Sequence, residues 1–176
     1  MSSERQKQFL FDEPSRLEAD AVGAPGSRRF RLLIEGRPGA ACLWMEKEQL
    51  QALGLAIDQL VAPLATLWDR TANPTVEPTR AGDFPENPAI ELQVGRLALG
   101  FNEEDKHFIV LVHDAEADPE GPATLTCRAT RAQLRALSQA ITALVSAGRP
   151  RCPLCGQPLG DGPHSCPGTN GHSVKP

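Results

Sequence analysis

The sequence predicts an α+β fold made of two similar halves, followed by a small cysteine-rich module at the C-terminus. Two amphipathic helices of closely similar sequence are expected at 49–61 and 133–145. A comparable series of short apolar segments precedes each of them. From residue 150 onward the chain holds three cysteines and two histidines but very few aliphatic side chains.

The two helices are the clearest elements. Residues 49–61 read QLQALGLAIDQLV, residues 133–145 read QLRALSQAITALV, and eight of 13 positions are identical. Apolar side chains recur at i, i+3, i+7 and i+10, which places them on one face of a helix. We therefore expect each helix to bury one face against a sheet. The two stripes are Leu50, Leu53, Ile57 and Leu60, and Leu134, Leu137, Ile141 and Leu144.

The segments before the helices strengthen the case for a repeat, because any two amphipathic helices share Leu and Ala. Phe30 aligns with Phe108, and Leu33 aligns with Leu111. The expected strands cover residues 16–22, 28–35, 40–45, 89–101, 106–113 and 123–129. Each half therefore has the order βββα, and the alternation of the long fourth strand slips at Gly95, which predicts a bulge.

Short connections between consecutive strands favour antiparallel pairing. The duplicated βββα halves, about 8–68 and 89–148, are expected to form one antiparallel sheet layer or a sandwich, with two helices. The proline-rich linker 69–88 joins them. The body then covers 1–148, and the tail covers 149–176.

Composition limits the class of protein. The chain of 176 residues has a net charge of −4, which argues against a nonspecific nucleic-acid binder. Fourteen arginines against four lysines are typical of a bacterial genome rich in GC. No apolar run approaches the roughly twenty residues of a membrane span. We expect a cytoplasmic protein that does not enter membranes, in which clustered cysteines bind metal more often than they form disulfides.

The tail has the spacing of a metal site. Cys152 and Cys155 stand at i and i+3 and are followed by a glycine that can adopt positive φ. His164 and Cys166 form a second arm, and His172 comes six positions later. The three cysteines are the expected ligands, and the fourth is His164 or His172.

The predicted metal is a structural Zn²⁺. Beyond proline, the only aliphatic side chains of 150–176 are Leu154, Leu159 and Val174, which cannot form a core. Metal binding must then supply the folding energy, on the order of ten kcal/mol in small zinc modules. Ligands are in surplus and no acidic residue occupies the usual general-base position, so a closed site is favoured over a catalytic one.

The body contains no recognisable catalytic motif. His107 and His113 flank an apolar strand without a nucleophile beside them and are interpreted as polar residues at strand ends. The glycine-rich segment 35–40 lacks the P-loop pattern and is expected to be a hairpin turn. Cys42 and Cys127 each stand alone in an apolar strand and, like Trp44, are expected in the core. We predict no catalytic residues and no organic cofactor.

Several segments resemble a known family. They are FDEPSR near the start, AVGAPGSRRF at 21–30, EKEQLQAL at 46–53 and the tail CPLCGQPLGDGPHSCPGTNG. Together they resemble the uncharacterised bacterial family called domain of unknown function number 3090, over nearly the whole chain. The resemblance implies Cys152, Cys155, His164 and Cys166 as ligands, and thus favours His164 over His172. Pro163 and Gly168 depart from the Gly and Arg of the family pattern.

Three functional hypotheses remain open. The first is a non-catalytic interaction or adaptor protein whose zinc-ribbon-like tail contacts another protein. The second is a nucleic-acid-associated factor that uses Arg149, Arg151 and Lys175 of the tail. The third is an enzyme with its active site between the two halves. The oligomeric state cannot be read from the sequence.

Overall fold

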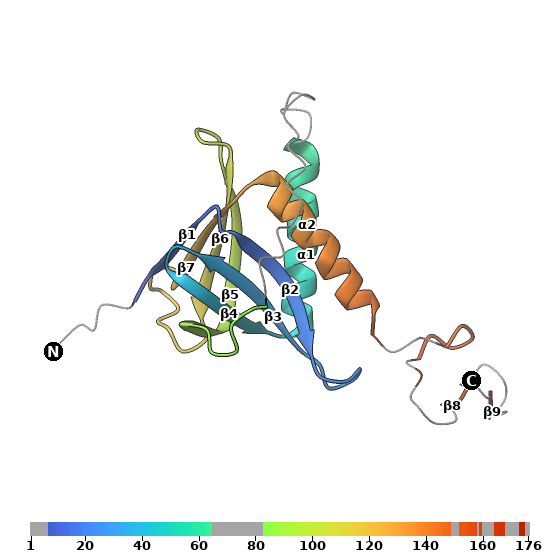
Figure 1. The fold of residues 1–176 in the computed structure, drawn as a ribbon. Helices are drawn as coiled ribbons and strands as arrows, with labels where there is room; N and C mark the ends of the chain where they lie inside the picture. The colour runs from blue at the N-terminus through green and yellow to red at the C-terminus, as the bar shows by residue number, and fades with distance from the viewer. Residues whose placement is uncertain are drawn as a thin grey trace.

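The computed structural model describes residues 7–64, 83–148, 152–157, 159, 164–167 and 173–174. Figure 1 shows a curled sheet with two helices along one side of it. In chain order the elements are β1 (Phe9–Asp12), β2 (Arg16–Val22), β3 (Arg29–Gly36), β4 (Gly39–Met45), α1 (Lys47–Leu64), β5 (Ile90–Asn102), β6 (His107–Asp114), β7 (Leu125–Ala129), α2 (Arg131–Ser146), and in the tail β8 (His164–Ser165) and β9 (Ser173–Val174).

The body is α+β, as predicted, and its strands form one sheet in the order β1-β7-β6-β5-β4-β3-β2. Four neighbouring pairs are antiparallel, whereas β4 with β5 and β1 with β7 are parallel. The expectation of an antiparallel sheet is therefore right for the hairpins only. The connection from β4 to β5 runs through α1, and a strand that returns after a crossover helix lies parallel to the first.

The sheet curls until its two ends meet. β1 and β2 stand at opposite ends of the strand order, yet only residues 13–15 join them. So short a link spans at most about 14 Å, so the two ends must lie close together. A Cβ placed on Gly36, at the end of β3, would lie 3.0 Å from Phe11 Cδ1 of β1. The interior of this curl contains Phe11, which is fully buried.

The two halves pair their strands in the same way. β5 pairs with β4 through Ile90–Gln93 and with β6 from Val94 onward, with a register shift at the predicted Gly95 bulge. In the other half β1 pairs with β7 and β2 pairs with β3. β1 and β2 together therefore correspond to the single strand β5 of the other half. A common origin of the halves by duplication is not tested by this arrangement and stays a prediction.

Equivalent glutamines bind the backbone at the bulge of β5 and at the corner between β1 and β2. Gln49 in α1 donates from Nε2 to the carbonyl oxygens of Val94 and Gly95, at 3.1 and 3.3 Å. Gln133 in α2 donates in the same way to the carbonyl oxygen of Pro14, at 2.7 Å. Each glutamine also accepts, through Oε1, the N–H of the residue three positions earlier. In each half the glutamine side chain therefore caps the start of its helix and links that helix to the sheet.

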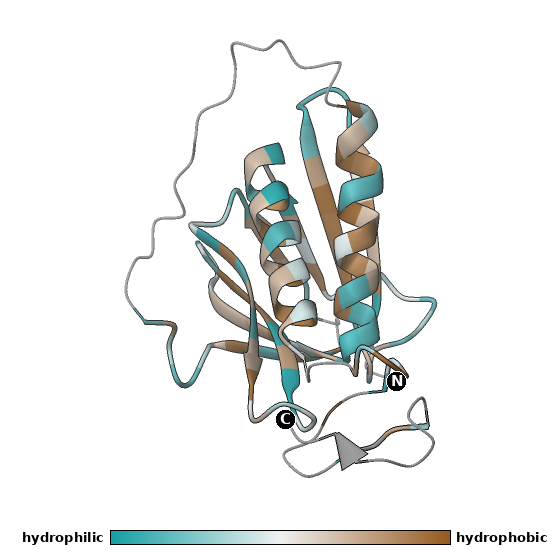
Figure 2. Cartoon of the chain, turned by 90° about the vertical axis from the view of Figure 1, so that its right-hand side faces the viewer, coloured by the Kyte–Doolittle hydropathy of each residue, from teal (hydrophilic) through white to brown (hydrophobic). Residues whose placement is uncertain are grey.

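Both predicted helices form and pack against each other and against the sheet (Figure 2). Their contact runs antiparallel, since Gly54 meets Ile141 and Asp58 accepts a hydrogen bond from Ser138 at 2.5 Å. A Cβ on Gly54 would lie only 2.9 Å from Ile141 Cγ2, so the absence of a side chain is what allows this close approach. The buried apolar stripe residues are Leu50, Leu53, Ile57, Leu134, Leu137 and Ile141.

We expect Gly54→Leu to destabilise the body by about 1–3 kcal/mol, because the new side chain must displace the packed Ile141. Leu has a much better helix propensity than Gly, so any loss reports the steric conflict. Gln51→Leu is the matched control, since it puts the same side chain on the exposed face of α1. Urea unfolding of both variants gives the comparison. Equal stability of the two would contradict the close helix contact.

Trp44 was expected in the core, but it does not lie there. Leu43 and Met45 point inward, so alternation along β4 directs Trp44 outward, where it is half-buried. The Arg29 and Arg31 guanidinium carbons lie 4.1 and 5.4 Å from the centre of its ring. Its indole Nε1 donates to Glu91 Oε1 at 2.6 Å. Cation–π contacts and this hydrogen bond, rather than apolar packing, hold the side chain.

A charged cluster ties the corner at Glu13 to the hairpin between β5 and β6. His107 contacts Glu13 Oε1 through Nε2 at 2.5 Å and the Asp105 carbonyl oxygen through Nδ1 at 2.7 Å. Arg128 donates to Asp12 and to Asp105. Partial burial lowers the pKa of His107, but the hydrogen bonds to Glu13 and to Asp105 outweigh it, and the pKa is raised from 6.5.

His107 should make the stability of the body pH-dependent. Because the folded state raises its pKa, the stabilising effect is complete below about pH 6.5 and is lost as pH rises through the folded pKa. The difference in unfolding free energy between wild type and His107→Gln is therefore expected to be larger at about pH 6 than at about pH 8.5. Urea titrations at both pH values measure it, with His113→Gln as the control. A difference that does not change with pH would refute the role of His107.

Three other expectations concern membrane-spanning segments, the linker and the boundary between body and tail. No helix in the described ranges is long and apolar enough to cross a membrane. Residues 65–82 lie outside the described residues, and with them most of the predicted linker 69–88. Residues 149–151 also lie outside them, so the boundary between body and tail stays a prediction.

Candidate metal centre

Two short arms bring the tail ligands together. The first is the turn that contains Cys152 and Cys155. The second is β8, which carries His164, and Cys166 directly after it. β8 pairs antiparallel with β9, so that His164 lies opposite Val174. This small hairpin was not predicted, because strands of two residues leave no periodic pattern in a sequence.

Backbone hydrogen bonds shape the first arm. The N–H of Gly156 donates to the carbonyl oxygen of Cys152, and the N–H of Cys152 donates to that of Gln157, both at 2.8 Å. Gly156 has φ of +71°, as the sequence led us to expect from a glycine after the second cysteine. The turn directs both sulfur atoms toward the second arm.

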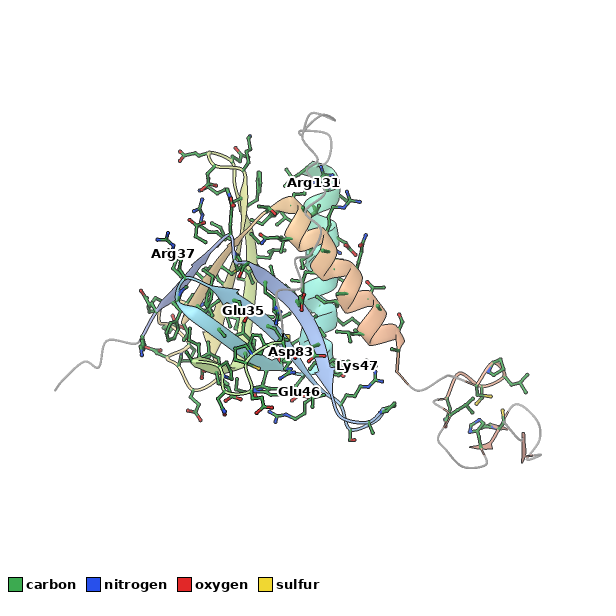
Figure 3. All side chains as sticks on the ribbon, viewed as in Figure 1. Glu35, Arg37, Glu46, Lys47, Asp83 and Arg131 are labelled. Atoms are coloured by element: carbon green, nitrogen blue, oxygen red, sulfur yellow. The ribbon has the colours of Figure 1, made fainter. Side chains whose placement is uncertain are left out.

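The four ligand atoms of Cys152, Cys155, His164 and Cys166 all lie within 4.8 Å of one another. The sulfur atoms of Cys152 and Cys166 are 3.7 Å apart, and Cys155 Sγ is 3.2 Å from His164 Nε2. All cysteines are free, so the cluster is not held by a disulfide. Figure 3 shows the sulfur atoms and the imidazole ring of the tail close together.

This spacing fits a tetrahedral metal ion. Two thiolates bound at about 2.3 Å in tetrahedral geometry have sulfur atoms about 3.8 Å apart. The observed distance of 3.7 Å between Cys152 and Cys166 is close to that value. Cys152 and Cys166 are buried, whereas Cys155 and His164 are partly exposed. The cluster can therefore hold a metal ion.

The electrostatics of the cluster favour a thiolate. N–H groups of Cys155 and Leu154 donate to Cys152 and lower the pKa of its thiol to about 6. The Gln157 N–H lowers the pKa of Cys155, but burial and the sulfur atoms of Cys166 and Cys152 outweigh it and raise that pKa. A thiolate is the form that binds metal, so Cys152 is prepared for coordination near neutral pH.

The structure separates the tail cysteines from the two in the body. Cys42 and Cys127 are buried, as predicted, although Cys42 lies on the outer side of β4, apart from the central core. Burial raises the pKa of both thiols, that of Cys127 to about 12. They stay protonated and lie outside the described metal cluster. His172, the alternative fourth ligand, falls outside the described residues.

The histidines of β6 do not converge. His107 begins the strand, and His113 lies near its end, where Arg96 contacts its ring at 3.2 Å. Six residues of strand separate the two by about 20 Å. Segment 35–40 is a hairpin turn between β3 and β4, as expected. His107 and His113 therefore do not share a site.

Comparison with known proteins places the chain in a family. Residues 9–166 match the family described as "Protein of unknown function (DUF3090)". The chain belongs to this family. No curated protein matches the sequence. The match to DUF3090 includes all four clustered ligands, from Cys152 to Cys166, and ends before His172.

Proposed function

We propose that this DUF3090 chain is a non-catalytic zinc protein, whose tail is shaped by one structural Zn²⁺ and contacts another protein. The four ligand atoms within 4.8 Å of one another carry the proposal. Three cysteines and one histidine are a donor set typical of structural zinc. A bound Zn²⁺ would supply the folding energy that the few aliphatic residues of the tail cannot provide.

A closed site is favoured over a catalytic one. Four protein ligands complete a tetrahedron and leave no position for a reacting water molecule. Catalytic zinc sites use three protein ligands and, in hydrolytic enzymes, a nearby carboxylate as general base. Among the described residues of the tail none is acidic. The metal would therefore hold the tail in its folded shape, and the surface of the folded tail would contact the partner protein.

The two alternatives have less support. The basic residues of the nucleic-acid hypothesis, Arg149, Arg151 and Lys175, lie outside the described residues, and the net charge of −4 opposes that hypothesis. An active site between the halves would need its polar groups in one cavity. The described groove that contains His113 does not contain His107.

Affinity capture from the native host tests the interaction role. Wild type and Cys155→Ser are used as bait at matched zinc concentration. We expect wild type to recover a partner that Cys155→Ser recovers at least about fivefold less, because loss of a ligand leaves the tail unfolded. Wild type stripped with a chelator and then reloaded with zinc is the control and should regain the partner. Equal recovery by both baits would refute the tail as the interaction module.

A further inference from the structure

The five cysteines of the chain differ in their access to solvent. Cys42, Cys127, Cys152 and Cys166 are at most 4% exposed, whereas Cys155 is partly exposed. Cys155 belongs to the metal cluster, and of the cluster sulfur atoms it is the one that a small molecule in water can reach. Exposure and thiolate character together decide which cysteine of a protein is oxidised first.

Metal binding would give the Cys155 sulfur the second of these properties. A thiolate, and not a thiol, attacks an oxidant, and a cysteine bound to a metal ion is a thiolate. Cys155 Sγ lies 3.2 Å from His164 Nε2, and His164 is the other partly exposed ligand. These two residues therefore form the side of the cluster that faces water, and an oxidant meets a sulfur atom there at Cys155.

The two cysteines of the body are protected from the same oxidant. Cys42 in β4 and Cys127 in β7 are buried. Burial raises the pKa of both thiols, that of Cys127 to about 12, so both are protonated at neutral pH. A buried thiol is a poor nucleophile. Oxidation should therefore be confined to the tail and should leave the body folded.

Cys152 is placed to react with an oxidised Cys155. It stands three residues earlier in the same turn, which the N–H of Gly156 closes by donating to the carbonyl oxygen of Cys152 at 2.8 Å. So short a loop keeps the two side chains near each other without help from a metal ion. Cys166 lies on the other arm, and only the bound metal would join that arm to the turn.

We propose that Cys155 is an oxidation site, and that a peroxide converts Cys155 and Cys152 into a disulfide that releases Zn²⁺ from the tail. The Cys155 thiolate attacks one peroxide oxygen, the O–O bond breaks, and a sulfenic acid and hydroxide form. The Cys152 thiolate then attacks the Cys155 sulfur atom, the S–O bond breaks, and a second hydroxide leaves. The two thiolates lose two electrons in total, and hydrogen peroxide with two protons becomes two water molecules.

The disulfide would remove two of the four ligands. His164 and Cys166 alone cannot complete a tetrahedral site, so the metal would leave and the tail would lose its shape. Reduction of the disulfide in the presence of zinc would restore both. The inference rests on the proposed function and adds a regulation to it, because the tail would contact its partner in the reduced state only.

Zinc release from the full-length protein tests the proposal. The reduced, zinc-loaded protein is treated with hydrogen peroxide, and the released metal is measured with a colorimetric zinc indicator. We expect about one zinc ion per disulfide formed, and full recovery after reduction with added zinc. Cys155→His exchanges the exposed thiolate for an imidazole, which also binds zinc, and should release the metal at least about tenfold more slowly. Cys127→Ser is the control in the body and should behave like wild type.

Peptide mapping identifies the disulfide, and it decides the question even if Cys155→His fails to bind zinc. Trypsin followed by cleavage before Asp161 separates the segment 152–160, with Cys152 and Cys155, from the segment that contains Cys166. In the oxidised protein we expect segment 152–160 to lack its two thiol hydrogens and Cys166 to be free. Cys42 and Cys127 should also be free thiols.

Three results would overturn the proposal. They are a zinc-loaded wild type that keeps its metal in peroxide, a disulfide that includes Cys166, and equal rates of release from wild type and a zinc-loaded Cys155→His. The zinc content is measured before peroxide is added. Absence of zinc at that stage would refute the metal site itself, whereas retention of zinc in peroxide would refute the oxidation site alone.

Discussion

Purified and reduced wild-type protein is expected to carry about one zinc ion per chain, and Cys166→Ser is expected to carry none. Cys166 is fully buried, and its sulfur atom lies 3.7 Å from that of Cys152, and among the described residues no side chain outside the cluster is placed to replace it. The loss should remove folding energy on the order of ten kcal/mol from the tail, which has no core to retain its shape. Elemental analysis gives the zinc content, and amide NMR spectra report the order of the tail.

Variants of the two histidines identify the fourth ligand. His164→Ala is expected to behave like Cys166→Ser, because His164 Nε2 belongs to the ligand cluster. His172→Ala is the control and should retain the metal. The thermal transition of the body should be the same in all variants, since the central core contains no residue of the tail. Wild type without bound metal, or with its cysteines bridged in pairs, would refute the proposed site.

Phe11→Ala is expected to cost about 3–5 kcal/mol of the free energy of unfolding of the body. Phe11 is fully buried on a strand of only four residues, and its ring lies against Gly36 of β3, which neighbours the last strand at the other end of the strand order. Its loss would leave a cavity where the two ends of the sheet meet, and β1 would lose its main anchor in the core. Denaturant unfolding measures the change.

Leu10→Ala is the control for this substitution. Leu10 is the preceding residue of the same strand and is 57% exposed, so its loss should change stability by no more than about 0.5 kcal/mol. The pair separates the burial of β1 from its backbone pairing with β7, which both variants retain. Similar effects of the two substitutions would show that β1 does not close the sheet.

Much of the body follows from local sequence patterns. The helices were placed by the 3.6-residue spacing of Leu50, Leu53 and Ile57 and of their equivalents, and the strands by alternation. The bulge was predicted from a single glycine, Gly95, at which the alternation slips. Such features depend on residues near one another in the chain, and local propensity and turn geometry determine them.

The position of Trp44 shows where local reasoning ends. Its size suggested burial in the core, but its neighbours Leu43 and Met45 occupy the inward positions of β4. The residues that bind Trp44 outside the core come from β3 and β5, and no pattern within 40–45 predicts them. The position of Phe84 over Arg16 of β2 is of the same kind. Long-range partners decide which face of a strand is buried.

The metal site lies between these cases. The Cys152 and Cys155 spacing and the His164 and Cys166 pair are local signals, and metal chemistry restricts such residues to few arrangements. The sequence alone left the choice between His164 and His172 open. These residues span fourteen positions, and only the folded tail brings the ligand atoms of Cys152, Cys155, His164 and Cys166 within 4.8 Å of one another, close enough to hold a metal ion.

The sequence by itself determined the class of the fold, the order of its elements and the three cysteines of the candidate metal site. Composition, periodicity and ligand spacing act over a few residues, so they can be read along the chain. Only the tertiary structure decided that the sheet curls until residues 13–15 join its ends, and that the ring of Phe84 lies over Arg16 of β2. Those outcomes depend on the packing of segments from both halves, and packing energy is set by groups that meet only in the folded chain.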